Sequence, residues 1–205
     1  RKYQTIVIDE MRRAIEPFKD RASYRRLKNL LRELKPDIVH THSAKAGILG
    51  RYAAWSLKGQ WTPNRPVVVH TLHGLSFHPY QGPWVNRLYV AIEKAAGKRT
   101  DYFISVADAM TEQSKAEGIG IDKPYVTAYS AIDEEQFLAP IPEAKRAEFR
   151  RKYDIPADAV VLVTIARLFE LKGHEYIIQS ARELSKRFAN VIWLFVGDGN
   201  LTDDY

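Results

Sequence analysis

The sequence predicts an α/β fold built from two domains of parallel β-α-β units. Short runs of β-branched and aromatic residues alternate with segments in which apolar residues recur every three or four positions, which is typical of strands joined by helices. A proline-rich stretch at residues 139–143 interrupts the alternation, which then resumes. We therefore expect one domain in residues 1–139 and a second in residues 140–205.

Several runs have the length and composition of strands. They are expected at residues 4–9, 37–41, 66–72, 101–106 and 125–129 before the linker, and at residues 160–165 and 191–196 after it. The run at 160–165 is uncharged and mainly β-branched, which is typical of a strand buried on both faces of a parallel sheet. We expect the strands ending at Thr41, Leu72 and Val106 to share one sheet, and the last two strands to share another.

The segments between these strands have the periodicity of amphipathic helices. They are expected at residues 24–35, 48–57, 85–96, 108–118, 144–153 and 174–188. Asp20 is placed to cap the first helix, and Pro36 ends it at Lys35 because the residue before a proline disfavours the helical conformation. One face of this helix is basic and is either a solvated surface or a patch for anions. Its residues are Arg25, Arg26, Lys28 and Arg32.

The composition excludes several classes of protein. With 45% hydrophobic residues the chain can form a packed core, and without cysteine it has neither disulfides nor cysteine-based metal sites, which fits a reducing compartment such as the cytoplasm. We expect neither a signal peptide nor a transmembrane helix, because no apolar run approaches the roughly 20 residues that span a bilayer. The net charge of +6 favours anionic partners such as phosphates or anionic lipid. Because no nucleic-acid-binding motif accompanies it, we do not expect nucleic acid as a partner.

The first candidate site follows the expected strand at residues 37–41. His42, Ser43, Lys45 and Gly47 stand at the start of a helix rich in small residues. The unpaired N–H groups and the dipole of a helix N-terminus favour negative charge, and small residues let a ligand approach closely. The alternative is structural: Ser43 caps the helix and His42 packs in the core.

The second candidate site follows the expected strand at residues 66–72. His73 and Gly74 stand at its carboxyl end, where Gly74 is expected to permit a sharp turn. A metal site made of His70, His73 and His78 is not expected, because His70 and His73 have opposite parity on a strand and face opposite ways. The alternative role for His73 is a structural histidine bonded to loop backbone.

The third candidate site follows the expected strand at residues 160–165. Arg167 and Lys172 come after its carboxyl end, which is where open α/β sheets bind ligands. A guanidinium forms paired hydrogen bonds with a phosphate, and an ammonium is a compact positive charge, so a phosphate is the expected ligand. Gly197 and Gly199, which follow the last strand, are assigned to the same cleft. The alternative is that both cations are ordinary solvated charges.

Four motifs together give the chain a resemblance to a known enzyme family. They are Ala166-Arg167-Leu168 followed by Lys172-Gly173, the string HTHSAKAGILGR at residues 40–51, the pair His73-Gly74, and Ser130-Ala131-Ile132-Asp133. The chain resembles the retaining glycosyltransferases of family 4, and in particular the branch that builds bacterial surface polysaccharides. It departs from the family pattern at Ala131 and Ala166, where the family has glycine.

The resemblance implies the GT-B fold, with two Rossmann-like domains. The domain at residues 1–139 would lie on the acceptor side, and residues 140–205 would begin the domain that binds the nucleotide-sugar donor. Both look incomplete beside the family, because the first lacks the opening glycine-rich β-α unit and the second stops after two strands. The family's E-x(7)-E segment, which holds the donor sugar and ribose, would lie downstream of residue 205. We therefore expect residues 1–205 alone to be inactive.

The resemblance also implies a reaction. A sugar would move with retention from a nucleotide-diphosphate sugar, most simply a UDP-sugar, to a saccharide or lipid-linked acceptor, without a metal or other cofactor. His73 would contact the donor sugar, and Arg167 and Lys172 would neutralise the diphosphate. The remaining candidates would line the donor and acceptor cleft; they are His42, Ser43, Lys45, Gly47, Gly74, Gly197 and Gly199. A UDP-sugar 2-epimerase of the same architecture and a non-catalytic nucleotide-sugar-binding module stay open as alternatives.

Peripheral binding at the inner face of the membrane is a further expectation. It rests on the net charge, on the basic face of the first helix, and on a loop that carries Phe77, Tyr80 and Trp84. A soluble protein with a basic surface is the alternative.

Overall fold

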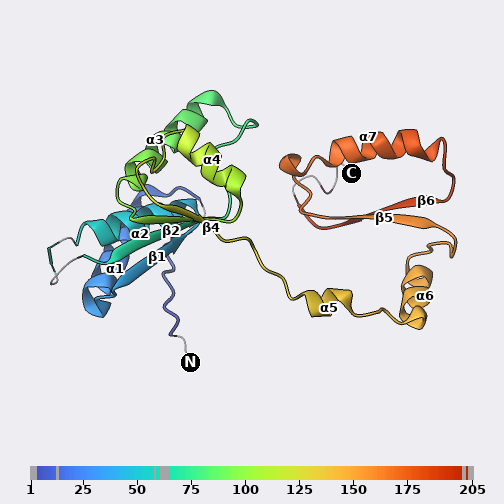
Figure 1. The fold of residues 1–205 in the computed structure, drawn as a ribbon, viewed down its shortest axis with the longest axis horizontal. Helices are drawn as coiled ribbons and strands as arrows, with labels where there is room; N and C mark the ends of the chain where they lie inside the picture. The colour runs from blue at the N-terminus through green and yellow to red at the C-terminus, as the bar shows by residue number, and fades with distance from the viewer. Residues whose placement is uncertain (1–3, 13, 58, 61–64, 200–201, 203–205) are drawn as a thin grey trace. The chain divides into compact units, whose positions relative to one another are not determined.

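The computed structural model describes residues 4–12, 14–57, 59–60, 65–199 and 202. These residues form two compact units, which divide between Ala131 and Ile132 (Figure 1). The division precedes the proline-rich stretch at residues 139–143. Each unit has its own sheet, so the two are described separately as unit 1 and unit 2.

Unit 1 is built on a parallel sheet of four strands. They are β1 (Ile38–His42), β2 (Val67–Leu72), β3 (Tyr102–Ser105) and β4 (Tyr125–Thr127), in the order β1-β2-β3-β4. The first two pair in register from Ile38 beside Val67 to His42 beside Thr71. Because all four strands run the same way, their carboxyl ends lie along one edge of the sheet, which we call the carboxyl edge.

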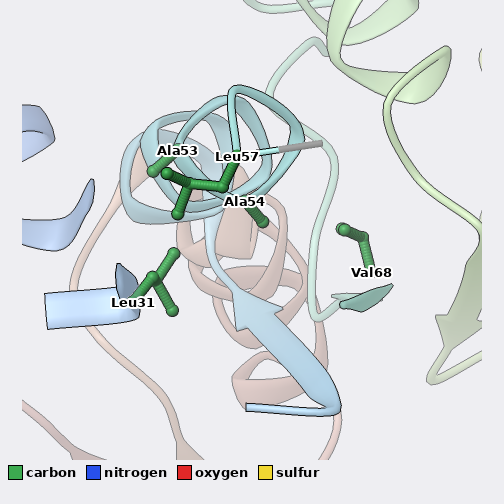
Figure 2. Packing of buried hydrophobic residues seen from close by; sticks show 5 residues of the cluster. All are labelled: Leu31, Ala53, Ala54, Leu57 and Val68. Carbon is green, nitrogen blue, oxygen red and sulfur yellow. The ribbon is translucent and has the colours of Figure 1, made fainter. Parts of the chain in front are cut away.

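Four helices lie between or before the strands of this sheet, and an aliphatic core cluster joins α1, the end of α2 and β2. The helices are α1 (Pro17–Leu34), α2 (Ala44–Trp55), α3 (Pro83–Gly97) and α4 (Asp108–Ala116). Figure 2 shows one core cluster, in which Leu31 of α1 and Val68 of β2 enclose the end of α2. The α2 side contributes Ala53, Ala54 and Leu57, and the two alanines allow close packing of the helix.

The predicted strand at residues 4–9 is wrong. These residues are irregular, and Val7 is 64% exposed. A β-branched run becomes a strand only where a neighbouring strand supplies hydrogen-bond partners, and β1 is paired with β2 alone. The sequence contains the propensity for this strand, but the described chain contains no partner for it.

The start of the first helix also differs from the prediction, whereas its end is confirmed. The helix α1 begins at Pro17, whose fixed φ suits a first helical position, so Asp20 does not cap it. Asp20 instead lies in the first turn, where its Oδ2 accepts a hydrogen bond of 3.1 Å from the backbone nitrogen of Glu16. At the other end Lys35 adopts a left-handed φ of 45° directly before Pro36.

The longest helix of the described residues is α1, at 18 residues, and it is strongly charged. Within the described chain, no helix has both the length and the apolarity required to cross a bilayer.

Unit 2 contains a two-stranded parallel sheet. Its elements are α5 (Glu134–Leu138), α6 (Glu143–Lys152), β5 (Val160–Ile165), the 3₁₀ turn η1 (Glu170–Lys172), α7 (His174–Ser185) and β6 (Val191–Val196). The strands pair over their whole length, from Val160 beside Val191 to Ile165 beside Val196. The predicted separation of the strands into two sheets is therefore confirmed.

The prediction that residues 160–165 are buried on both faces is wrong for the described chain. Val160 and Val163 are each 51% exposed, and Ile165 is 78% exposed. Figure 1 shows α7 running along one side of the β5–β6 pair, where the ring of His174 lies 5.7 Å from that of Phe195. Two strands with one adjacent helix cannot bury both faces of the sheet. The described residues therefore leave apolar side chains of β5 exposed.

Candidate functional site

The carboxyl edge of unit 1 brings polar residues from all four strands together. His42 is the last residue of β1, and His73 directly follows β2. Asp108 starts α4 after β3, and Tyr129 comes two residues after β4. Ligands of open α/β sheets bind at this edge, so we take these residues as the candidate site of unit 1.

Three imidazoles form what we call the histidine row: His40, His42 and His73. The Nδ1 atom of His42 lies 2.9 Å from Nε2 of His73, and the ring centroids of His40 and His42 are 4.3 Å apart. His40 is anchored in turn, because its Nε2 lies 2.7 Å from the hydroxyl of Thr71. Partial loss of hydration, followed by the proximity of His40 and His73, lowers the pKa of His42. His42 is therefore predominantly neutral at neutral pH, and it is on the exposed edge rather than packed in the core.

His70 faces away from the histidine row, as the strand parity predicts. It is 2% exposed, and its Nδ1 lies 2.9 Å from the hydroxyl of Thr41. Burial, reinforced by the nearby charge of Arg51, lowers the pKa of His70 to about 3. Among the residues that the structure describes, no group of three or more histidine, aspartate or glutamate side chains is arranged to hold a metal ion.

Gly47 lies directly beneath this buried histidine. A Cβ atom added to Gly47 would come within 2.5 Å of Cε1 of His70. Real side chains do not approach so closely, so the glycine here makes room for the His70 ring. Arg51 donates from Nε to the backbone oxygen of Gly47 at 3.1 Å and from Nη2 to Glu93 at 2.8 Å, which joins α2 to α3 through a buried ion pair.

Ser43 precedes α2 in a strained backbone conformation. Its φ is 60° and its ψ is 164°, a region that is otherwise almost confined to glycine and costs about 1–3 kcal/mol. Its hydroxyl makes no capping hydrogen bond to the helix, which contradicts the alternative in which Ser43 is a simple cap. The strained residue thus lies directly after His42, at the carboxyl edge.

Lys45 holds the segment before α1. Its Nζ donates to the backbone oxygens of Arg12, at 2.9 Å, and of Ala14, and it forms an ion pair with Asp20. The sequence analysis placed Lys45 in the donor and acceptor cleft, and the sequence gives no sign of these partners, which lie 25 or more positions earlier. In the structure these three groups already engage its ammonium group.

Gly74 leaves open space next to His73. Its φ lies outside the left-handed region, so the expected conformational reason for a glycine does not apply. A Cβ added here would meet no atom within 4 Å. What the glycine provides is an unobstructed surface beside the imidazole.

The opposite half of the carboxyl edge is a hydroxyl and carboxylate cluster that sequence reasoning missed. Asp108 accepts hydrogen bonds from the hydroxyls of Thr127, at 2.5 Å, and Tyr129, at 2.6 Å. These two hydrogen bonds lower the pKa of Asp108, and the bond from Thr127 has the larger effect. The same carboxylate raises the pKa of Tyr129. The available signal was the alternation of Thr127 and Tyr129 at the end of one strand, together with an aspartate that starts the helix before that strand.

In unit 2, Arg167 and Lys172 follow the carboxyl end of β5 and are both exposed. The Arg167 guanidinium lies 5.9 Å from the ring of Phe169, and neither cation forms an ion pair with any described residue. Lys172 ends η1, and Gly173 then adopts a left-handed φ of 66° before α7. Ala166 has a negative φ, as does Ala131, so alanine in place of the family's glycine causes no backbone strain at either position.

Gly197 and Gly199 pack against the backbone that carries Arg167. An added Cβ would come within 1.9 Å of the Ala166 oxygen at Gly197 and of the Leu168 oxygen at Gly199. The hydrogen bonds of the sheet continue through this region, from Ala166 N to Val196 O and from Leu168 N to Asp198 O, each 3.1 Å long. The two glycines therefore allow the segment 197–199 to approach residues 166–168 closely, and these hydrogen bonds hold the two segments together.

A cavity of about 630 Å³ lies elsewhere in unit 1. It is bounded by α3, α4 and the loop before α3, which Asn86 clamps by bonding both the backbone nitrogen, at 3.1 Å, and the backbone oxygen, at 2.8 Å, of His78. Tyr80 and Trp84, in the same loop and at the start of α3, are 65% and 79% exposed. None of the residues lining this cavity belongs to the candidate site at the carboxyl edge. They are Phe77, His78, Pro79, Asn86, Arg87, Val90, Ala91, Lys94, Gln113, Ala116 and Glu117.

The sequence is similar to a glycosyltransferase family and to individual glycosyltransferases. Residues 5–136 match the family model described as Glycosyltransferase Family 4. The chain is 31% identical over 196 residues to UDP-Gal:alpha-D-GlcNAc-diphosphoundecaprenol alpha-1,3-galactosyltransferase of Escherichia coli, covering 94% of this chain and 48% of that protein. It is 28% identical over 190 residues to alpha-D-kanosaminyltransferase of Streptomyces kanamyceticus, covering 88% of this chain and 46% of that one.

A similar fold is found among solved structures. Anabaena HepE in complex with UDP-glucose matches with a TM-score of 0.70 at 19% identity, over 93% of this chain and 48% of HepE. The chain thus spans about half the length of the relatives it matches.

Proposed function

Because the chain belongs to glycosyltransferase family 4 and has the GT-B fold, we propose that the protein transfers a sugar with retention from a UDP-sugar to a saccharide or lipid-linked acceptor. The E. coli relative is named for a UDP-galactose donor and a lipid-diphosphate acceptor, and HepE binds UDP-glucose. The observation in this chain that carries the proposal is His73, exposed at the carboxyl edge beside the open space at Gly74. The product would enter polysaccharide or glycoconjugate biosynthesis.

Arg167 and Lys172 are proposed to bind the donor diphosphate. They are exposed at the carboxyl edge of the β5–β6 pair, and neither is neutralised by a described carboxylate. Two fixed positive charges can stabilise the negative charge that develops on the leaving diphosphate, which is commonly the largest contribution to catalysis. On this proposal the reaction needs no metal ion.

His73 is proposed as the catalytic residue on the sugar side. Its Nε2 lies against His42, so its Nδ1 is the nitrogen available to a hydroxyl of the donor sugar. A hydrogen bond that strengthens as the glycosidic bond breaks lowers the barrier without tightening ground-state binding. Retention is proposed to occur by attack on the same face as the leaving group. Asp108, the carboxylate of this edge, already accepts two hydroxyl hydrogen bonds and is a poor nucleophile.

We further propose that the protein binds peripherally to the cytoplasmic face of a membrane. The exposed Tyr80 and Trp84 and the basic face of α1 are suited to an anionic lipid surface, where each basic residue contributes about 1 kcal/mol. Sedimentation of the full-length protein with vesicles of anionic and of zwitterionic phospholipid at low salt tests this. Equal binding to the two, or none, would contradict it.

A coupled assay tests the central proposal. The full-length protein is incubated with UDP-glucose, UDP-galactose and UDP-N-acetylglucosamine, with and without saccharide and lipid-diphosphate acceptors, and UDP release is measured together with the sugar configuration. Acceptor-dependent UDP release with an unchanged anomeric configuration is expected. An epimerised UDP-sugar would indicate a 2-epimerase, and binding without turnover of any donor would indicate a non-catalytic module.

A further inference from the structure

We propose that His42 is a positioning residue for His73: it holds His73 with its proton on Nδ1, so that His73 presents a hydrogen-bond donor to the cleft. This inference rests on the proposed function, in which His73 donates to a hydroxyl of the donor sugar. It goes beyond that function because it assigns a role to His42 through its contact with His73, not through contact with the substrate.

The geometry of the pair couples the two rings. The distance of 2.9 Å between Nδ1 of His42 and Nε2 of His73 is that of a hydrogen bond. Such a bond needs one proton between the two nitrogens, since two N–H groups would clash and two lone pairs would repel each other. When the proton belongs to His42, the Nε2 of His73 is an acceptor, and a neutral His73 must then carry its own proton on Nδ1.

The surroundings of His42 limit its movement. Its ring lies beside that of His40, and His40 is held by the Thr71 hydroxyl at 2.7 Å. His42 itself is the last residue of β1, where Thr71 is its partner in the ladder. The next residue, Ser43, is strained, with a φ of 60°, so the direction in which the chain leaves the strand is also fixed. The His42 ring therefore meets His73 from a rigid strand end and not from a free loop.

Open space lies at Gly74, the residue that follows His73. Gly74 presents no side chain, and an added Cβ there would meet nothing within 4 Å. One ring nitrogen of His73 is thus occupied by the protein, while the next residue leaves room for a ligand. This is the arrangement of a side chain oriented by a second residue that does not itself touch the ligand.

Two substitutions at one position test the proposal. His42→Ala removes the donor, whereas in His42→Asn the side-chain amide nitrogen can occupy the place of Nδ1 and still donate to His73. The first readout is the tautomer of His73, measured by long-range ¹H–¹⁵N NMR on the full-length protein labelled in histidine and assigned with His73→Gln. We expect the Nδ1–H tautomer in the wild type and in His42→Asn, and a mixture or the Nε2–H tautomer in His42→Ala.

The second readout is kinetic. His42→Ala should lower kcat for sugar transfer about 10- to 100-fold with less than a twofold change in the Kd for UDP, and His42→Asn should recover most of the loss. His78→Ala, which removes a histidine outside the row, is the matched control and should behave as the wild type. Circular dichroism verifies that each variant is folded.

The outcomes separate this inference from the proposed function. If the His73 tautomer is the same in the wild type and in a folded His42→Ala, or if the wild type holds the Nε2–H tautomer, the positioning role is overturned. If the wild type turns over no UDP-sugar while the tautomer follows His42 as expected, the proposed function fails and the coupling of the two rings stands.

Discussion

The two carboxyl edges of this molecule differ in whether their polar groups are already paired. In unit 1 the candidate residues contact one another: His42 contacts His73, and Asp108 accepts from Thr127 and Tyr129. In unit 2 the cations Arg167 and Lys172 are exposed and form no ion pair with any described residue. The comparison indicates that unit 1 holds a preformed arrangement of hydrogen-bonding groups, whereas unit 2 presents positive charge that an anion would neutralise.

The residues beneath the two carboxyl edges are packed differently. In unit 1 a buried layer beneath the edge is packed around His70, with Gly47 leaving space for its ring. In unit 2 the glycines at 197 and 199 let two backbone segments approach each other, and the side chains of the sheet are half-buried or exposed. Substitutions in unit 1 should therefore affect side-chain packing and chemistry, and substitutions in unit 2 should mainly affect anion binding.

The largest effect is expected from His73→Ala, which breaks the preformed edge. Removing one preorganised donor from an active site commonly lowers kcat by about 100-fold or more. We expect a fall of that order in sugar transfer by the full-length protein, with little change in KM for the donor, because the contact strengthens in the transition state. A folded variant that keeps wild-type kcat would remove His73 from the catalytic machinery.

Arg167→Ala and Lys172→Ala test the other edge. Loss of a charged hydrogen bond costs about 1.5–3 kcal/mol, so each variant should bind UDP roughly 10- to 150-fold more weakly in calorimetry. Arg182→Ala, which removes an exposed cation from α7, is the matched control and should bind UDP normally. Unchanged affinity in both test variants would place the diphosphate site elsewhere.

Two glycines of unit 1 differ in the space around them: Gly47 lies against the His70 ring, and Gly74 lies in open space. Gly47→Ala would bring a Cβ within 2.5 Å of the His70 ring, and overpacking of this kind costs about 1–3 kcal/mol, so the thermal midpoint should fall. Gly74→Ala meets no atom within 4 Å and should unfold like the wild type. Equal midpoints for Gly47→Ala and the wild type would show that the His70 ring can move aside.

The sequence predicted those features that depend on local pattern. The β-branched runs after residue 36 all form strands, and they separate into two parallel sheets as expected, because period and composition specify strands in this fold. The opposite orientations of His70 and His73 also followed from parity alone.

The features that the sequence did not predict depend on contacts between residues that are distant in the sequence. Residues 4–9 have strand propensity but no neighbouring strand, and β5 has the composition of a buried strand but little cover in the described chain. The contacts of Lys45 with Arg12 and Asp20 join residues 25 or more positions apart, so the sequence alone did not indicate them. The cluster around Asp108 joins residues from the ends of two strands, and only the folded sheet brings them together.

The most gradual of the expected effects is a dependence of stability on pH that arises in unit 1. His70 has an ordinary pKa near 6.5 when unfolded and a pKa of about 3 in the native state, because the buried ring resists protonation beside Arg51. Between these two values the unfolded chain binds the proton and the native chain does not. Native stability from this residue is therefore complete above pH 6.5 and declines as the pH falls toward 3, by no more than about 1.4 kcal/mol per pH unit.

Urea unfolding of the full-length protein at pH 7.5, 6.0 and 5.0 measures this decline. His70→Gln lacks the titrating ring, so its free energy of unfolding should be lower at pH 7.5 but should fall less on acidification than that of the wild type. His78→Gln removes a histidine from the loop before α3 and should retain the wild-type slope, which distinguishes the buried ring from histidines in general. The charged and titratable groups near enough to act on the buried His70 ring are Arg51 of α2 and, more weakly, His42 and His40 on the other face of β1. The lowered pKa of His42 adds a weaker decline of the same sign. If the slopes of the wild type and His70→Gln coincide, the native state protonates His70 as readily as the unfolded chain does, and the layer beneath the carboxyl edge of unit 1 does not exclude the charged ring.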